Sequence, residues 1–263
     1  GFLGILHMEI IQERIEREYG IGIIMTAPSV EYKITFKNKG EQLVNNPSAI
    51  DLSEVDNIQE PWIKSTIICP DKYIGKIMDL ISSRRGTSSN IEYLNTSENS
   101  SALNRILITF EIPLGEILIG FYDHLKSVTQ GYGSMDYEII GFNQTNVAKV
   151  DILINQEKID SLSIFISKEK SYYYGKELVS KLKELIPRQL FEVPIQAAIG
   201  SRIIARETVK ALRKNVTAKC YGGDITRKKK LLEKQAEGKK RLKKLGKVEI
   251  PQEAFLSILN INR

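Results

Sequence analysis

The side chains best suited to chemistry in this sequence are the lysines and arginines near its C-terminal end. Between Gly200 and Lys247 there are 17 Lys or Arg residues and 4 Asp or Glu residues, a net charge of +13. The remaining residues have 21 basic and 28 acidic side chains, so a mildly acidic body carries one strongly basic segment. A segment of this kind favours a polyanionic partner, either a nucleic acid or an anionic membrane surface.

We predict that the basic segment binds RNA phosphates, because phosphate backbones recruit such side chains through counterion release. The plainer alternative is a solvated charged helix, but such a helix normally mixes charges of both signs. A membrane helix needs a broad apolar face, so membrane association is expected only as weak and peripheral. Tyr221 could stack on an exposed base. The predicted RNA-binding residues are Arg202, Arg206, Lys210, Arg213, Lys214, Lys219, Tyr221, Arg227, Lys228, Lys229, Lys230, Lys234, Lys239, Lys240, Arg241, Lys243 and Lys244.

No other motif predicts catalysis or a bound cofactor. The phosphate loop Gly-x-x-x-x-Gly-Lys-Ser/Thr is absent from the chain. His7 and His124 have no Cys or His neighbours at ligand spacing, which argues against a metal site. Cys69 and Cys220 are 151 residues apart, and two cysteines fit a reducing compartment better than a disulfide framework. We therefore predict no catalytic, cofactor-binding or metal-binding residue in this chain.

Two short glycine motifs have a structural interpretation. In Tyr221-Gly222-Gly223-Asp224 the glycines suggest a hinge, and Asp224 suggests a cap for the helix that follows. Arg84-Arg85-Gly86 suits the end of a helix, because cations interact favourably with a helix C-terminus and glycine can terminate it. An RNA contact by these arginines is the alternative.

Apolar residues recur at spacings of three and four in some segments, which predicts helices, and at spacings of two in others, which predicts strands. Together these patterns predict an α+β protein. A helix is expected over 7–19 with a left-handed cap at Gly20, followed by strands over 21–25 and 30–36. Residues 37–60 are polar and predict a linker or long loop. Strands over 63–69, 90–94, 105–112 and 134–142, with helices over 71–86 and 115–129, give the order βαββαβ of a ferredoxin-like domain.

The remaining elements predict a second α/β domain. A hairpin is expected over 149–166 around Asn155-Gln156, then a helix over 175–186 and a strand over 191–199. Pro194 favours an edge or a bulge for that strand. Residues 202–247 have helical propensity but almost no apolar face, and residues 251–261 predict a short closing helix. At the other end, the apolar residues that directly follow Gly1 suggest a chain cut inside a domain.

Long stretches of the sequence resemble the LepA (elongation factor 4) family of translational GTPases. The segment from Gly1 to Tyr19, followed by Thr26-Ala-Pro-Ser-Val30, is similar to the latter half of domain III in translational GTPases. The resemblance to the C-terminal domain particular to LepA rests on Leu185-Ile-Pro-Arg-Gln189, Ile195-Gln-Ala-Ala-Ile-Gly200, Ile203-Ile-Ala-Arg206, Leu212-Arg-Lys-Asn-Val216, Ala218-Lys-Cys-Tyr-Gly-Gly-Asp-Ile225, Arg227-Lys-Lys-Lys-Leu-Leu232 and Pro251-Gln-Glu-Ala-Phe255.

The resemblance implies four regions. Residues 1–36 would be a remnant of domain III, and residues 37–60 a linker. Residues 61–144 would match domain V of elongation factor G, and residues 145–263 would be the LepA-type C-terminal domain with its basic arm. The nucleotide-binding domain is missing, so no catalytic residue can be carried over, and GTP and Mg²⁺ are implied only for the parent protein.

The resemblance also implies partners and a role. The parent would hydrolyse GTP on the ribosome and remodel or reverse tRNA positions. This chain would then be a monomer that binds ribosomal RNA and tRNA, either in the cytoplasm or in an organelle matrix. Two alternatives stay open. The chain could be an independent RNA-binding or ribosome-assembly module without GTPase activity. Alternatively, the intact protein could be an enzyme of the GTPase class.

Overall fold

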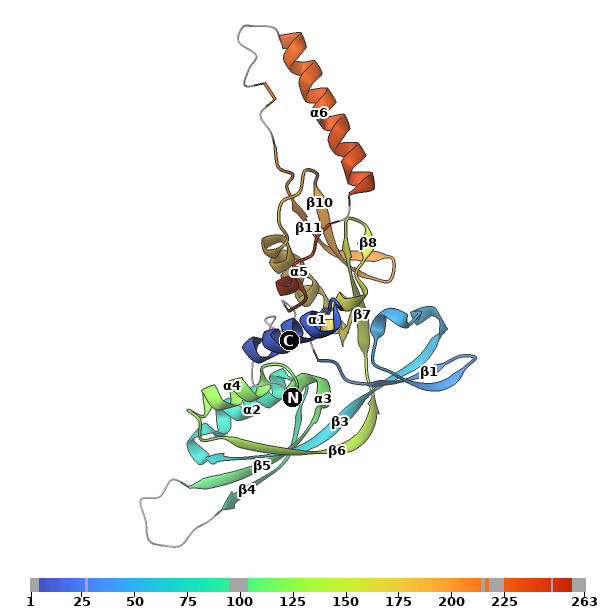
Figure 1. Ribbon diagram of the computed structural model, residues 1–263. Coiled ribbons are helices and arrows are strands. Elements are labelled where there is room, and N and C mark those ends of the chain that lie inside the picture. Colours follow the sequence, from blue (N-terminus) through green and yellow to red (C-terminus); the bar gives the residue numbers. More distant parts are fainter. Residues whose placement is uncertain are drawn as a thin grey trace.

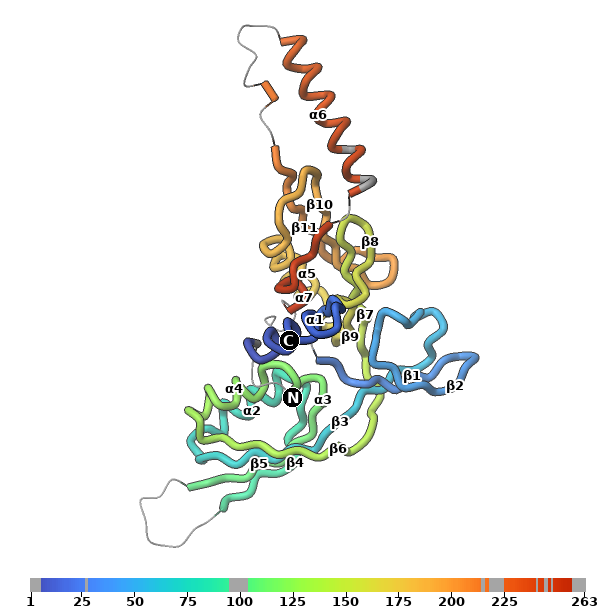
Figure 2. Tube along the Cα trace, viewed as in Figure 1, coloured from blue at the N-terminus to red at the C-terminus, as the bar shows by residue number. Residues whose placement is uncertain are grey.

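The computed structural model describes residues 5–26, 28–94, 104–213, 216–217, 225–246 and 248–256. Two antiparallel sheets with their helices form the body. One long helix, α6 (Ile225–Leu245), stands away from it at the end opposite the hairpin of β4 (Thr87–Leu94) and β5 (Arg105–Pro113) (Figure 1). The tube in Figure 2 shows the chain passing from the lower sheet through β7 (Val147–Ile154) into the upper one. The described residues contain no helix that is long and apolar enough to cross a membrane. The predicted α+β class is confirmed.

The N-terminal helix α1 (Ile5–Tyr19) ends as predicted. Gly20 has φ 65°, and its N–H donates to the Glu16 carbonyl at 2.9 Å, which closes the helix with a left-handed residue. The strand expected over 21–25 is wrong, because this segment has no strand assignment and pairs with no strand in the described residues. A strand needs a neighbouring strand to bond its backbone groups. Here Gln12 supplies one donor, to the Ile23 carbonyl at 3.1 Å.

Residues 37–60 form regular structure in place of the expected linker. Strands β1 (Tyr32–Phe36) and β2 (Gly40–Val44) form a hairpin, and two single 3₁₀ turns, Pro47–Ala49 and Leu52–Glu54, lead into β3 (Val55–Pro70). β1 pairs with β3, so the hairpin belongs to the lower sheet. Its polar sequence resembled a loop because β2 is almost fully exposed and therefore needs no apolar face.

The ferredoxin-like domain has the predicted βαββαβ order. β3 is followed by α2 (Ile74–Ser83), β4 (Thr87–Leu94), β5 (Arg105–Pro113), the helix pair α3 (Leu114–Ile117) and α4 (Phe121–Val128), and β6 (Ser134–Gln144). The strands lie in the order β4-β5-β3-β6. Fully buried Ile63, Ile77, Phe110 and Phe121 form part of the core between sheet and helices. The single helix expected over 115–129 is split, because Gly120 adopts φ 69° between α3 and α4.

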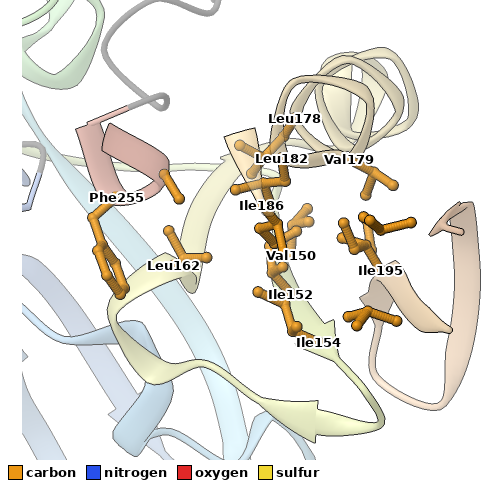
Figure 3. Close-up of a cluster of buried hydrophobic side chains, with 14 of the residues drawn as sticks. Val150, Ile152, Ile154, Leu162, Leu178, Val179, Leu182, Ile186, Ile195 and Phe255 are labelled. Carbon is orange, nitrogen blue, oxygen red and sulfur yellow. The ribbon is translucent and has the colours of Figure 1, made fainter. Parts of the chain in front are cut away.

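The C-terminal domain packs one helix, α5 (Lys168–Leu185), on a five-stranded sheet. Its strands are β7 (Val147–Ile154), β8 (Glu157–Lys158), β9 (Ile164–Ser167), β10 (Val193–Ile199) and β11 (Arg202–Val209). The predicted turn at Asn155-Gln156 is confirmed, with φ values of 53° and 71° that match a tight hairpin. Leu178 and Leu182 of α5 lie over Val150 of the sheet, and Val179 lies over Ile195 (Figure 3).

Two predictions for this domain need correction. Pro194 predicted an edge strand or a bulge. The edge is wrong, because β10 is an interior strand between β11 and β7, whereas the pairing of β10 with β11 does shift register between Ala197 and Ala198. Pro194 lacks an N–H donor, but it is only the second residue of the strand and precedes the pairing of β10 with β7, which begins at Ile195. Its carbonyl still accepts from Asn155 N–H at 2.9 Å. The segment expected to be helical over 202–247 begins as strand β11, which pairs with β10 from Val193 to Ile199. The helix α6 (Ile225–Leu245) and the short α7 (Gln252–Leu256) follow.

Candidate nucleic-acid interface

The helix α6 is the most strongly basic element of the molecule. Its 21 residues contain ten Lys or Arg and two Glu, and span about 31 Å at the usual rise per residue. Lys, Arg, Leu, Glu and Gln all favour helices. Glu237 and Arg241 form an i,i+4 ion pair at 2.8 Å, but most of the charges repel their neighbours. Contacts with the body must therefore help to hold this helix.

The body holds α6 at its C-terminal end. The Asn155 side-chain amide, in the β7–β8 turn, donates to the Lys243 carbonyl at 3.3 Å. Just beyond the helix, Gly246 donates to the Leu242 carbonyl at 2.7 Å and lies so close to Phe191 that an added Cβ would be 2.5 Å from the ring. The chain then returns to the core, where Ala254 and Phe255 are buried. The far end of α6 stands clear of both sheets (Figures 1 and 2).

Most of the predicted RNA-binding side chains on α6 lie at the surface of the protein. Lys240 and Lys244 belong to α6, but their side chains lie outside the described structure. Lys228, Lys239 and Lys243 are half-buried along one side of the helix. The exposed ones are Arg227, Lys229, Lys230, Lys234 and Arg241. The helix thus presents cations to solvent on several faces, which suits a phosphate backbone better than a single point-like ligand.

A second group of predicted residues lies on β11 and the segment after it. Arg202, Arg206, Lys210 and Arg213 are exposed, whereas Lys214, Lys219, Tyr221 and the predicted Gly222-Gly223 hinge and Asp224 cap lie outside the described residues. Glu207 pairs with Lys183 of α5 at 2.8 Å, so alternation along the strand places Arg206 on the sheet face away from α5. The basic segment therefore provides two separate strips, one on a strand and one on a helix.

The arginine pair at the end of α2 has a structural role. Arg85 N–H donates to the Ser82 carbonyl and Gly86 N–H to the Ile81 carbonyl, which is the Schellman pattern of a helix end. Arg85 occupies the left-handed position with φ 62°, where glycine is usual. Gly86 is needed one residue later, because an added Cβ would lie 2.6 Å from the Ile81 side chain.

The strained backbone of Arg85 places its guanidinium between two buried carboxylates. The guanidinium donates to both oxygens of Glu60, at 2.7 and 3.1 Å, and to Glu116 at 2.8 Å. Burial lowers the pKa of Arg85, but the hydrogen bonds and charges of Glu60 and Glu116 outweigh it and raise the pKa overall. Arg85 is thus engaged inside the protein, which favours the helix-end interpretation over an RNA contact.

The described residues contain no group of three His, Cys, Asp or Glu side chains that could hold a metal ion. Cys69 is 1% exposed, and its burial, with a smaller effect of Asp71, raises the pKa of the thiol to about 11. A thiol protonated at neutral pH is a poor nucleophile and a poor metal ligand.

Comparison with protein families gives two adjoining matches. Residues 57–153 match the family described as elongation factor G C-terminus, and residues 154–260 match the one described as GTP-binding protein LepA C-terminus. The two matches therefore place the chain in the class formed by the C-terminal regions of translation elongation factors. The ferredoxin-like sheet lies in the first match and the basic helix in the second.

Similar proteins extend this result over the whole chain. Elongation factor 4 of Shouchella clausii is 55% identical over 263 residues, and the proteins of the same name from Chlorobium limicola and Geobacillus thermodenitrificans are 54% and 55% identical. In each comparison the match covers 100% of this chain and 42% of the relative. The chain belongs to the elongation factor 4 (LepA) family and corresponds to the C-terminal part of its members. It spans less than half the length of these relatives.

Proposed function

We propose that this chain is the ribosome- and tRNA-binding C-terminal part of a translational GTPase of the elongation factor 4 type. The observation that carries the proposal is α6, a helix with ten basic and two acidic residues that is held at one end and stands away from the body. Its exposed cations can follow an RNA backbone without disturbing either core. Contacts of this kind position a protein on RNA and do not read its bases.

The proposal assigns different tasks to different parts of the intact protein. GTP and Mg²⁺ would bind to a domain that this chain does not contain, and GTP hydrolysis there would drive the remodelling or reversal of tRNA positions. The two domains described above would hold the basic strips at a fixed place relative to the ribosome. The chain itself would act in the cytoplasm as a monomer on its RNA partners, without catalysing a reaction.

Sedimentation with ribosomes and gel-shift binding to tRNA test this proposal. We expect the purified chain to bind both partners and to lose most of this binding when Lys229 and Lys230 are changed to Glu. The matched control changes Lys64 and Lys76 to Glu, because these lysines are also exposed but lie on the ferredoxin-like domain. Equal losses for the two pairs would contradict a specific role for α6, and no binding by the unaltered chain would contradict the proposal itself.

A further inference from the structure

An apolar groove lies between α6 and the segments that flank the β10–β11 hairpin. It has a volume of about 430 Å³ and is lined by Leu190, Leu212, Gly238 and Leu242, with Arg213 and Lys239 at its walls. Leu190, Leu212 and Leu242 remain 59%, 47% and 43% exposed. Three exposed leucines around one groove, beside or within the most highly charged part of the chain, indicate a surface that a ligand covers.

Gly238 lines this groove and contributes no side chain to it. It lies inside a helix, where glycine is disfavoured relative to alanine. Gly246 and Gly175 are explained by close neighbours, since an added Cβ would lie 2.5 Å from Phe191 and 2.8 Å from Ile204 respectively. At Gly238 an added Cβ would meet no atom within 4 Å, and the backbone φ is not positive. Neither packing within the chain nor backbone conformation therefore accounts for this glycine.

The charged side chains that line the groove indicate which kind of ligand it can bind. Neither Arg213 nor Lys239 forms an ion pair with an acidic side chain in the part of the chain that the structure describes. The leucines that line the groove suit a flat, uncharged ring, and the two cations that also line it suit the phosphates on either side of that ring. An unpaired nucleotide of RNA has both features. A lipid surface would need a broad apolar face in place of a single slot.

We propose that this groove binds one unpaired nucleobase of the RNA whose phosphates lie along α6. This inference rests on the proposed RNA-binding function and adds to it a contact with a base. Arg213 and Lys239 neutralise the phosphates that flank the base, while Leu190, Leu212 and Leu242 contact its faces and edges. RNA with single-stranded nucleotides is then preferred over a continuous duplex of the same length.

The test fills the groove without changing any charge. Gly238→Leu places a side chain in the open space and favours the helix, so folding should be retained, and Gly238→Ala is the control that favours the helix but leaves most of the groove empty. The probes are a short single-stranded RNA that carries one 2-aminopurine and an RNA duplex of equal length. We expect Gly238→Leu to weaken single-strand binding by about fivefold or more and to abolish the 2-aminopurine fluorescence change. Duplex binding and the salt dependence should stay the same.

The possible outcomes distinguish base binding in the groove from the proposed RNA-binding function of the chain. If Gly238→Leu binds the single strand as tightly as Gly238→Ala does, the groove does not hold a base, although RNA binding by α6 stands. If single-strand and duplex binding fall equally, Gly238 acts through the helix and not through the groove, which also overturns this inference. If the unaltered chain binds neither probe, the proposed function and the groove are both wrong.

Discussion

The ammonium group of Lys170 lies 2.9 Å from the carbonyl oxygen of Ser83, and this hydrogen bond joins the first turn of α5 to the last turn of α2. The same ammonium lies 3.8 Å from Glu116, which Arg85 also contacts. Burial lowers the pKa of Lys170, and the charge of Glu116 opposes this effect. A half-buried lysine thus links the C-terminal domain to the helix end of the ferredoxin-like domain.

Replacing Lys170 should loosen this junction between domains. Lys170→Met roughly keeps the length of the side chain but removes the hydrogen bond to the Ser83 carbonyl and one of the cations near Glu116, which Arg85 still contacts. We expect the free energy of unfolding to fall by roughly 1 kcal/mol, as for one hydrogen bond. Amide exchange of α2 and α5 should accelerate as well. Lys168→Met, an exposed position on the same helix, is the control and should change neither measurement. If the two variants behave alike in urea unfolding, Lys170 does not link the domains.

Arg85 should tolerate neither glycine nor lysine. Arg85→Gly relieves about 1 kcal/mol of left-handed strain but leaves Glu60, which is 2% exposed, as an uncompensated buried charge. Breaking a buried pair costs about 3–5 kcal/mol, so a net loss of roughly 2–4 kcal/mol is expected in urea unfolding. Arg85→Lys should also destabilise, because an ammonium group cannot bond Glu60 in a bidentate manner.

Gln156→Gly provides the matched comparison for Arg85→Gly. Gln156 has φ 71° and an exposed side chain, so its replacement relieves strain without removing a buried partner. We expect this variant to be as stable as the unaltered chain or slightly more stable. A stabilising effect of Arg85→Gly similar to that of Gln156→Gly would show that the contacts with Glu60 and Glu116 contribute little.

The buried thiol of Cys69 should be unreactive in the folded chain. Its pKa is raised from 9.0 to about 11, so the folded state keeps the proton that the unfolded chain loses first. The stability from this group is complete below pH 9 and is lost as the pH rises from 9 to 11. In a Cys220→Ser background, alkylation by iodoacetamide at pH 8 should require unfolding. Rapid alkylation under native conditions would contradict the burial of this thiol.

Local sequence signals predicted the elements whose ends depend on nearby residues. Gly20 predicted the end of α1, and Asn155-Gln156 predicted a hairpin, because each needs a backbone conformation that few residues adopt. The βαββαβ order followed from apolar periodicity, since one face of each element is buried. In these cases local chemistry and tertiary structure agree.

The misassigned elements depend on distant partners. The segment from Arg202 to Val209 has many polar residues, but it forms a strand because β10 bonds its backbone and Ile204 packs near Gly175 of α5. Likewise β2 is held by β1, and not by an apolar face of its own. The sequence also located the basic side chains of the candidate site. It did not show that they form two strips, or that Leu190 and Leu242 border a groove, because those relations arise only in the folded chain.

The central claim is that the exposed and half-buried cations of α6 bind RNA phosphates. Changing Arg227, Lys228, Lys229 and Lys230 to Ala removes four of its ten positive charges. Folding stability should change by less than about 0.5 kcal/mol, because surface substitutions away from special features have small effects. A control with Arg227→Lys and Lys→Arg at the other three positions keeps the charge and should bind as the unaltered chain does.

Binding to tRNA over a series of salt concentrations is the most direct measurement of that claim. Each phosphate that the protein neutralises adds about −0.7 to −0.9 to the slope of log K against log salt. The four-alanine variant should therefore show a slope that is flatter by roughly 2 to 4 units, for all RNA sequences alike, with the charge-preserving control unchanged. A slope equal to that of the unaltered chain, in a variant that remains folded, would show that these side chains are only solvated and would contradict the account.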